Sequence, residues 1–555
     1  MTSSSWPFHS RRSSVWSTRA IVAASQPLAV QAGLDILRAG GNAADAAVSV
    51  AAALNVTEPA STGIGGDCFC LFYDAKTKTV KGLNGSGRAP AALTLDFAQS
   101  RGYEGIIPPT DSNSVTVPGA AAGWVDTVEL FGSGKLGLDE ILAPAISLAE
   151  KGFPVSAVSA TLWEKAEAKI LAASPNSGEI LRNGKAPKEG EIIKLPELAE
   201  TFRALARDGK QGFYEGRIAQ ALVEVIESQG GVMTLEDLKY HTSTRTDPIS
   251  IDYGGVRLHE HPPNGQGIVA LIALGIIHEL ESSGRTPRLL DLPHNSAEYL
   301  HIIIEALRLG FADAQWFVSD PEKVAVPNGL LDKKYLASRA QGFQRDHAAV
   351  DVVRGSPANS CDTVYFSIVD EEGNACSFIN SVYHSFGTGI VAKGTGFALQ
   401  CRGSNFSLEP ESPNVLAPGK RPYHTIIPAM ITDPVTDDLR YCYGVMGGFM
   451  QPQGHVQVLL NILRGMDPQA ALDAPRICIG ADDDKGKIFI EHGIDEQVVD
   501  SLRAMGHRVV ISYGHDRAVF GRGQVIGVAS VEKDRTRVLV AGSDPRADGC
   551  AAPLL

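Results

Sequence analysis

Apolar residues recur at helical spacing near the start of the chain and predict a helix over residues 25–38, which the Gly40-Gly41 pair then ends. Asn42 can cap a second helix over residues 43–54, where nearly every side chain is small and apolar. A helix that is apolar all round is expected to be buried on several sides. A further apolar stripe predicts a core-facing helix over residues 297–315.

A glycine-rich stretch, residues 62–67, precedes a predicted strand over residues 68–73. The stretch lacks the Lys-Ser/Thr pair of a phosphate-binding loop and the glycine spacing of a dinucleotide-binding fold. Tight backbone packing is therefore the better interpretation. Cys68 and Cys70 stand two apart, which places both side chains on one face of the strand and predicts a packing role.

The sequence changes character sharply before residue 363. Residues 340–362 are polar and rich in Gly, Ser, Pro and Asn, which predicts an exposed connector. The residues that follow predict a hairpin, with strands over 363–369 and 375–382 joined by a turn. A strand therefore begins directly where the connector ends.

Composition narrows the class of protein. The chain has 555 residues, 44% of them hydrophobic and 20% charged, which is ordinary for a folded protein with a large core. A net charge of −13 argues against nucleic acid as a partner, because phosphate binding needs a concentrated positive field. The eight cysteines do not form zinc-type pairs and the 14 histidines are scattered, with His259 and His261 the closest pair. We predict no metal site and no cofactor.

The N-terminal residues are rich in serine and basic side chains, without an apolar run long enough for a signal peptide. No stretch of about 20 apolar residues follows, so no membrane partner is expected. We interpret residues 1–20 as a flexible tail of a cytoplasmic protein, with a transit peptide as the competing interpretation.

Thr363, at the junction of connector and strand, is a candidate nucleophile. In an intact chain its hydroxyl is a weak nucleophile with no base nearby in the sequence. If the bond between Asp362 and Thr363 is broken, Thr363 gains a free α-amine with a pKa of about 7.7 to 8.0, which can accept the proton of the hydroxyl. Nucleophile and base then belong to one residue, although the same threonine could equally be an ordinary strand residue.

The surrounding motifs resemble the γ-glutamyltransferase family of N-terminal nucleophile hydrolases. Residues 362–370 (DTVYFSIVD), followed by Gly373-Asn374, 386–390 (FGTGI), 419–422 (GKRP) and Gly447-Gly448, are similar to its small subunit. The large subunit is matched in order by 31–33 (QAG), 40–47 (GGNAADAA), 57–59 (TEP) and 63–66 (GIGG), and the closing motif by 544–546 (DPR). The resemblance spans roughly residues 20 to 550.

This resemblance implies an α+β fold, a four-layer αββα sandwich, in which a large subunit (21–362) and a small subunit (363–555) are interleaved. Self-cleavage between Asp362 and Thr363 would produce the two chains, a heterodimer that can assemble further. The mature family enzyme carries an acyl group on the threonine. Gly447 and Gly448 match the oxyanion-hole glycines, whose N–H groups meet the charge on the attacked carbonyl. Ser381 matches a hydroxyl that supports the threonine.

Several substrate-binding positions depart from the family pattern. The arginine of the family's R-E-x-A-P stretch is displaced by two residues here, to Arg88. Arg402 and Asn405 stand where the family presents an acceptor and an aspartate to the substrate's α-amine, a change that favours a carboxylate over a cation. Tyr383 replaces the usual asparagine, and His424-Thr425 replace paired serines. The loop over residues 408–419 is also shorter than the family's lid, which predicts a more open site.

Three functions remain open. The leading hypothesis is a self-processing threonine enzyme that cleaves γ-glutamyl amides, such as glutathione, and transfers the acyl group to water or to an amino acid or peptide. The second keeps this chemistry for glutaryl-like or other carboxyl-bearing acyl amides, because of Arg402 and Asn405. The third is an inactive scaffold or binding protein, against which the combined presence of Thr363, Ser381 and the glycine pair counts.

Overall fold

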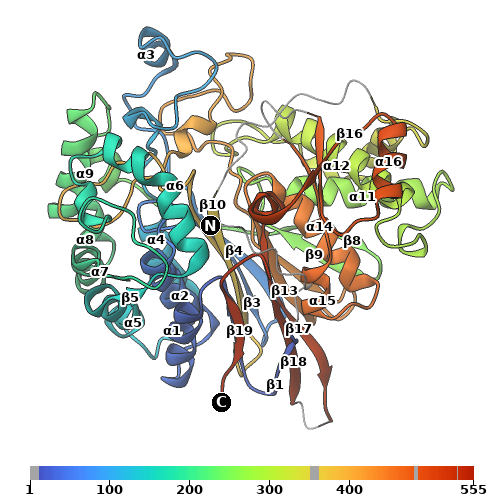
Figure 1. The fold of residues 1–555 in the computed structure, drawn as a ribbon, viewed down its shortest axis with the longest axis horizontal. Coiled ribbons are helices and arrows are strands. Elements are labelled where there is room, and N and C mark those ends of the chain that lie inside the picture. Colours follow the sequence, from blue (N-terminus) through green and yellow to red (C-terminus); the bar gives the residue numbers. More distant parts are fainter. Residues whose placement is uncertain (1–11, 350–361, 481–485, 534–535) are drawn as a thin grey trace.

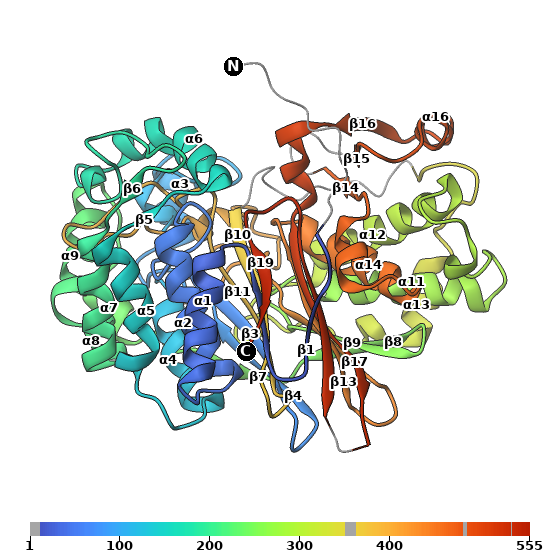
Figure 2. The same cartoon turned by 60° about the horizontal axis from the view of Figure 1, so that its bottom comes forward.

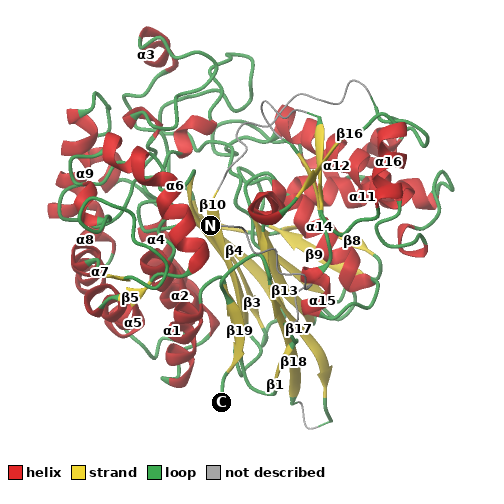
Figure 3. Cartoon of the chain, in the orientation of Figure 1, coloured by secondary structure: helices red, strands yellow, loops and turns green. Residues whose placement is uncertain are grey.

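The structure, a computed structural model, describes residues 12–349, 362–480, 486–533 and 536–555. Two seven-stranded sheets lie face to face in the middle of the molecule, and helices cover the outer face of each (Figures 1 and 3). The order of layers is therefore helix, sheet, sheet, helix. This is the four-layer α+β sandwich that the resemblance implied.

The first sheet carries the strand that begins at residue 362. All its neighbouring strands pair antiparallel. In spatial order the strands are β19 (Cys550–Pro553), β2 (Ile21–Ala24), β10 (Asp362–Val369), β11 (Ala375–Tyr383), β3 (Asp67–Asp74), β4 (Thr79–Gly85) and β7 (Thr244–Thr246).

The second sheet is antiparallel as well. Its order is β1 (Val15–Ser17), β18 (Arg537–Ser543), β17 (Arg522–Val531), β13 (Leu439–Met446), β12 (Ala429–Thr432), β9 (Val256–Glu260) and β8 (Ile249–Tyr253). Two small sheets lie outside the sandwich: β14 (Ile477–Ile479), β15 (Lys487–Glu491) and β16 (Arg508–Ser512) form one, and β5 (Phe153–Pro154) with β6 (Ile192–Ile193) the other. Figure 2 shows the three-stranded sheet at one edge of the molecule, beside α16 (Glu496–Ala504).

The helices divide between the two outer layers. The layer over the first sheet contains α1 (Pro27–Arg38), α2 (Ala43–Thr57), α4 (Ala120–Phe131), α5 (Leu138–Lys151), α6 (Ala157–Ala173), α7 (Pro196–Asp208), α8 (Lys210–Tyr214) and α9 (Gly216–Ser228). The short helix α10 (Leu235–Lys239) contacts α8 and α9, and α3 (Leu95–Ser100) lies at the top of Figure 1. The layer over the second sheet contains α11 (Ile268–Ser282), α12 (Ala297–Phe317), α13 (Lys333–Ala340), α14 (Met450–Leu463) and α15 (Pro468–Asp473).

Three apolar clusters correspond to the three interfaces between layers. One joins the first sheet to its helices, with α2 packed on β10 and β11. A second joins the other sheet to α11, α12 and α14. A third, smaller cluster lies between the sheets and includes Leu71, Met430 and Ile526. Burial of apolar area on both faces of each sheet holds the sandwich together.

The predicted elements of the core are confirmed. The helices expected over residues 25–38, 43–54 and 297–315 are α1, α2 and α12, and the strand and hairpin are β3, β10 and β11. Every residue of α2 is buried, and the side chain of Asn42 caps it. Small side chains are needed there because the helix packs directly on the first sheet.

The glycine-rich stretch is also a packing feature, as predicted. A Cβ atom on Gly65 would lie 2.5 Å from the carbonyl oxygen of Ala398, and one on Gly66 would lie 2.2 Å from that of Ser381. Cys68 and Cys70 are buried in the cluster between the first sheet and its helices.

Part of the predicted N-terminal tail is ordered in the structure. Residues 15–17 form β1 and pair with β18, where an unstructured tail was expected through residue 20. Backbone hydrogen bonds to a sheet edge order this segment despite its polar composition. Most of the predicted connector, residues 350–361, lies outside the described residues. Within the described ranges, no helix combines the length and apolar character that a bilayer crossing requires.

Candidate active site

Thr363 lies near the start of β10, and its side chain is fully buried. Its Oγ1 donates a hydrogen bond of 3.1 Å to Oγ of Ser381 on the adjacent strand β11. The register between these strands shifts between residues 362 and 364. Such an irregularity interrupts the regular alternation of side chains and re-aims them. Here it accompanies the pairing of the two hydroxyls that the resemblance had singled out.

Ser381 and Arg402 form the centre of the site. The Ser381 hydroxyl accepts a hydrogen bond of 3.2 Å from Nη2 of Arg402 and one of 2.9 Å from the backbone N–H of Tyr383. Nη1 of Arg402 donates to Oγ1 of Thr425 at 2.8 Å. The structure therefore connects the predicted nucleophile, its supporting serine and the predicted carboxylate-binding arginine through consecutive hydrogen bonds.

Tyr383 and Asn405 hold the arginine in place. The guanidinium carbon of Arg402 lies 4.2 Å from the centre of the Tyr383 ring, a cation–π contact. The hydroxyl of Tyr383 donates to Oδ1 of Asn405 at 2.8 Å, and Nδ2 of Asn405 donates to the carbonyl of Tyr423. Tyr383 has a φ of 77°, which is rare for a bulky side chain and is held by this packing.

Asp67 and His424 form a buried pair next to this cluster. Nε2 of His424 lies 3.0 Å from Oδ2 of Asp67, and Oδ1 of Asp67 accepts hydrogen bonds from the backbone N–H groups of Gly87 and Gly119 and from Nε2 of Gln400. Asp67 thus has hydrogen-bond donors on both carboxylate oxygens, which stabilises its charged form. It belongs to the glycine-rich motif, although the sequence did not mark it as a site residue.

The charge states of this pair follow from its surroundings. Burial and the positive charge of Arg402 lower the pKa of His424 to about 4, against the opposing effect of Asp67. Burial raises the pKa of Asp67, but its hydrogen bond to His424, the charge of His424 and the charge of Arg402 together bring the pKa below its usual value. Near neutral pH the pair is therefore a neutral imidazole on a carboxylate, and His424 does not compete with Arg402 as a cation.

The Gly447-Gly448 turn lies at the N-terminus of α14. The carbonyl of Gly447 accepts a hydrogen bond of 3.0 Å from the N–H of Met450 in the first turn of this helix. Because the peptide unit is planar and trans, the N–H of Gly448 points in the opposite direction from that carbonyl. Both glycines have positive φ values, 131° and 58°. The positive end of a 14-residue helix adds to the attraction of this turn for an anion.

Gln266 links the glycine turn to the arginine cluster. It is fully buried, and its Nε2 donates to the carbonyl of Gly448 at 2.8 Å and to the carbonyl of Thr425 at 2.6 Å. Its Oε1 accepts a hydrogen bond from the Tyr423 hydroxyl. In the sequence Gln266 is marked only weakly, as a glutamine between two glycines just before an apolar helix.

Arg88 occupies a separate ion-pair cluster. Its guanidinium donates to the carbonyl of Thr242 and to the carboxylate of Glu322, which also binds Arg421. Burial raises the pKa of Glu322, but hydrogen bonds to and charges of the two arginines lower it overall, to about 2. The structure therefore does not join Arg88 to the cluster of Thr363 and Arg402.

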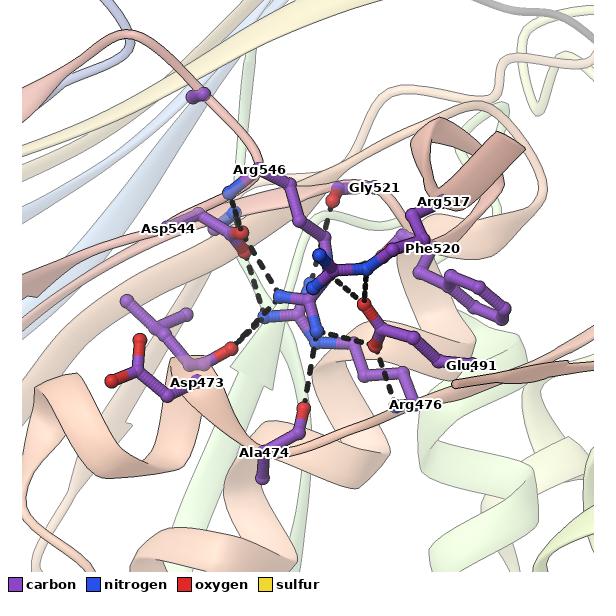
Figure 4. A network of polar contacts seen from close by, with 12 residues as sticks. Asp473, Ala474, Arg476, Glu491, Arg517, Phe520, Gly521, Asp544 and Arg546 are labelled. Atoms are coloured by element: carbon purple, nitrogen blue, oxygen red, sulfur yellow. Dashed lines mark hydrogen bonds and ion pairs between the residues drawn. The ribbon is translucent and has the colours of Figure 1, made fainter. Parts of the chain in front are cut away.

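A network of buried ion pairs holds the loop that packs against the glycine turn (Figure 4). Arg476 donates to the carbonyls of Phe520 and Gly521 and pairs with Asp544 at 2.7 Å. The Cα of Gly521 lies 3.0 Å from where a Cβ of Gly447 would be. The network thus fixes the loop that packs against the predicted oxyanion hole.

The closing motif belongs to the same network. Arg546 forms ion pairs with Asp544 and with Glu491, and Glu491 also forms an ion pair with Arg517 (Figure 4). Burial raises the pKa of Asp544, but the charges of Arg476 and Arg546 lower it overall, to about 2. The motif at residues 544–546, noted in the sequence only by resemblance, therefore has a structural role in the protein.

Among the residues that the structure describes, one group has the donor types of a metal site. Ligand atoms of His301, Glu305 and His507, all buried, lie within 4.8 Å of one another. The two imidazoles already bond to each other at 2.8 Å, and Glu305 binds the guanidinium of Arg308 and the N–H of Ala349. Since the two imidazoles bond to each other and the Arg308 charge opposes a cation, we assign no ion to this group.

The fold and the site define an N-terminal nucleophile hydrolase. The chain belongs to the γ-glutamyltranspeptidase family, whose sequence pattern it matches over residues 29–554. It is therefore an enzyme of this type, as the resemblance predicted.

Known relatives cover almost the whole chain. The Glutathione hydrolase-like YwrD proenzyme of Bacillus subtilis is 36% identical over 97% of this chain and 99% of its own length. The Oxamate amidohydrolase proenzyme of Klebsiella pneumoniae is 33% identical over 97% of this chain and 98% of its own length. The crystal structure of cephalosporin acylase from Bacillus halodurans superposes with a TM-score of 0.89 at 40% identity, covering 99% of this chain and 98% of that one.

Proposed function

We propose that the protein is a self-processing threonine amidohydrolase for amides whose acyl group carries a carboxylate. The observation that carries this proposal is the continuous contact from Thr363 through Ser381 to Arg402, which places a candidate nucleophile beside a buried guanidinium. Cleavage after Asp362 would leave chains of residues 1–362 and 363–555.

Self-cleavage begins with Oγ1 of Thr363 attacking the carbonyl carbon of Asp362. The bond to the Thr363 nitrogen breaks as that nitrogen takes a proton, so that the peptide becomes an ester on the hydroxyl. Water then hydrolyses the ester, leaving the carboxylate of Asp362 and restoring the hydroxyl. The free α-amine of Thr363 is the product that the later reaction needs.

In each turnover the α-amine takes the proton of the Thr363 hydroxyl as Oγ1 attacks the substrate amide. The N–H groups of Gly447 and Gly448 stabilise the oxyanion, helped by the N-terminus of α14. The amine passes its proton to the leaving nitrogen, and an acyl ester remains on Thr363. Water, or an acceptor amine, then attacks this ester and releases the acyl group.

Arg402 and Asn405 favour an acyl group without an α-amine. A guanidinium attracts a carboxylate through charge-assisted hydrogen bonds and repels a nearby ammonium. The names of two relatives, an oxamate amidohydrolase and a cephalosporin acylase, concern amides without a γ-glutamyl group. A γ-glutamyl substrate is the second candidate, because the family and the glutathione hydrolase-like relative carry that chemistry in their names.

Denaturing electrophoresis tests the nucleophile. Wild type is expected to give two bands, Thr363→Ala one band of 58.9 kDa without activity, and Thr363→Ser, which keeps a hydroxyl and an amine, two bands again. A fully active wild type that runs only as the intact chain would refute the proposed mechanism.

A matched substrate pair tests the acyl preference. Glutaryl-p-nitroanilide and γ-glutamyl-p-nitroanilide have the same chain length and differ only in the α-amine. We expect a higher kcat/KM for the glutaryl compound by about 10-fold or more, since one charge-assisted contact changes sign. A preference for the γ-glutamyl compound would favour the second candidate and leave self-cleavage untouched.

A further inference from the structure

The loop over residues 408–419 lies against the candidate active site and is held there by polar contacts. We infer that Asn414, within this loop, is a positioning residue, whose amide fixes Asn405 and the segment over residues 423–425 for substrate binding. The inference rests on the proposed function, in which the acyl group lies beside Asn405. It adds a residue that none of the sequence motifs includes.

The amide of Asn414 bridges two segments of the site. Its Nδ2 donates a hydrogen bond of 2.6 Å to the carbonyl of Asn405, and its Oδ1 accepts one of 2.8 Å from the N–H of Tyr423. Since one partner is a carbonyl and the other an N–H, only this orientation of the amide satisfies both. Nδ2 of Asn405 also donates to the carbonyl of Tyr423 at 2.8 Å. Three hydrogen bonds thus join the three residues in a closed ring.

The two bridged segments meet again at a single guanidinium. On one side, Oδ1 of Asn405 accepts the hydroxyl of Tyr383, whose ring lies against the guanidinium of Arg402. On the other side, the hydroxyl of Thr425 accepts a hydrogen bond from the same guanidinium. A shift of one segment relative to the other would therefore move these groups apart, and the bridge opposes that shift.

A buried lysine holds the loop on either side of Asn414. Nζ of Lys420 donates to the carbonyl of Pro413 at 2.6 Å and to that of Val415 at 2.9 Å, the residues directly before and after Asn414. Only 1% of Lys420 is exposed. Burial lowers the pKa of Lys420 to about 8, against the opposing charge of Asp320. The ammonium is therefore mainly charged near neutral pH, and its hydrogen bonds to the loop are charge-assisted.

The course of the loop has separate support. Leu408 and Leu416 are buried in an apolar cluster with Phe406. The N–H of Leu416 donates to the carbonyl of Ser407 at 2.9 Å. Because these contacts do not involve the amide of Asn414, replacing that amide is expected to leave the path of the loop unchanged. The amide itself supplies the exact placement that a binding site needs.

Steady-state kinetics of Asn414→Leu test the inference. Leucine is close to asparagine in size and shape and removes both hydrogen bonds. On the p-nitroanilide that wild type hydrolyses better, glutaryl or γ-glutamyl, we expect KM to rise by about 10-fold or more and kcat to change by less than about 3-fold. This split is expected because the hydrogen bond between Thr363 and Ser381 does not involve the loop.

Asn374→Leu is the matched control. Asn374 lies in the turn between β10 and β11, at the opposite end of this hairpin from Thr363. Its Oδ1 also accepts a backbone N–H, that of Ala75 at 3.0 Å, and its Nδ2 donates to Asp370 at 3.0 Å. Urea unfolding of both variants measures the loss of stability. A similar loss with a raised KM only in Asn414→Leu is expected. A wild-type KM in folded Asn414→Leu, or an equal rise in both variants, would overturn the inference.

Two further variants identify the contacts that matter. Lys420→Met keeps an unbranched side chain without the ammonium and is expected to raise KM in the same direction, by about 3-fold or more. Asn414→Asp keeps the acceptor for the N–H of Tyr423 but places an oxygen against the carbonyl of Asn405, so KM is expected to stay raised. A wild-type KM in Asn414→Asp would remove Asn405 as the residue that is positioned, and a wild-type KM in Lys420→Met would remove the part of the lysine.

Failure of this inference is distinguishable from failure of the proposed function. All these variants retain Thr363 and Ser381, so they are expected to cleave themselves into the two chains as wild type does. Two chains with an unchanged KM in Asn414→Leu would remove the positioning role and keep the threonine mechanism. Intact chains in an active wild type would remove the mechanism itself.

Discussion

Replacing Gln266 with leucine tests whether the glycine turn has to be held in place. The amide of Gln266 donates to the carbonyls of Gly448 and Thr425, so it joins the predicted oxyanion hole to the residue that binds Arg402. It contacts neither the nucleophile nor the guanidinium in these bonds. Its effect on catalysis is therefore expected to come from the position of the turn.

The size of the effect follows from the bonds that are lost. A buried carbonyl left without a donor costs about 1 to 3 kcal/mol. The carbonyl of Gly448 keeps a second donor, the N–H of Gln451 at 3.2 Å, so the full cost applies mainly to Thr425. We expect a loss of about 1 to 3 kcal/mol in the free energy of unfolding. A displacement of the turn by a fraction of an ångström to 1 Å lowers kcat by about 10- to 100-fold.

Gln457→Leu is the matched control. Nε2 of Gln457 also donates to two backbone carbonyls, those of Gln453 and Ile477. Gln457 is buried on α14, the helix that has the glycine turn at its N-terminus. Urea unfolding of both variants and kcat on a common anilide give the comparison. Similar destabilisation with a kcat loss only in Gln266→Leu is expected. An equal kcat for the two variants would refute the idea that Gln266 positions the turn.

Three further outcomes are expected. Ser381→Ala removes the acceptor of the Thr363 hydroxyl, and both self-cleavage and kcat should fall by about 10- to 100-fold, measured by band conversion and by anilide hydrolysis. Because the folded pKa of Asp544 is about 2 against a usual 3.8, its stabilisation is complete above about pH 4 and is lost as the pH falls toward 2. That loss amounts to about 2 kcal/mol. Urea unfolding of the uncleaved Thr363→Ala protein, with and without Asp544→Asn, should show the difference between the two shrinking over this range. The two cleaved chains should also elute together in non-denaturing gel filtration and separate only in denaturant; separate elution would contradict the interleaved arrangement.

The sequence predicted the elements that local pattern controls. The small apolar run of α2 with its Asn42 cap favours a buried helix, and the β-branched and aromatic residues of β10 and β11 favour strands. The structure joins Thr363, Ser381, Arg402 and Thr425, which the resemblance had placed in the site, through consecutive hydrogen bonds. Their individual roles remain predictions.

Long-range contacts account for what was missed. Arg88 was considered for the site because of its motif, but an acid 234 positions away, Glu322, pairs with it elsewhere. Asp67 and Gln266 gave little signal because each acts through partners far along the chain, His424 and Gly448. Nothing in local spacing fixes such pairs, which depend on how the two sheets and their loops come together.

The interleaving of the two halves shows how the proposed cut next to the nucleophile would leave the site intact. In the first sheet, β10 from the second half lies between β2 of the first half and β11, which in turn pairs with β3 of the first half. β10 pairs with β11 through residue 369 and with β2 over residues 367–369, so breaking the bond before residue 363 would free one end of a strand that stays paired in the sheet. The second sheet alternates in the same way, with β9 of the first half beside β12 of the second. A new α-amine can therefore form at Thr363 while Ser381 and Arg402 keep their places around it, which an exposed terminus on a separate domain could not provide.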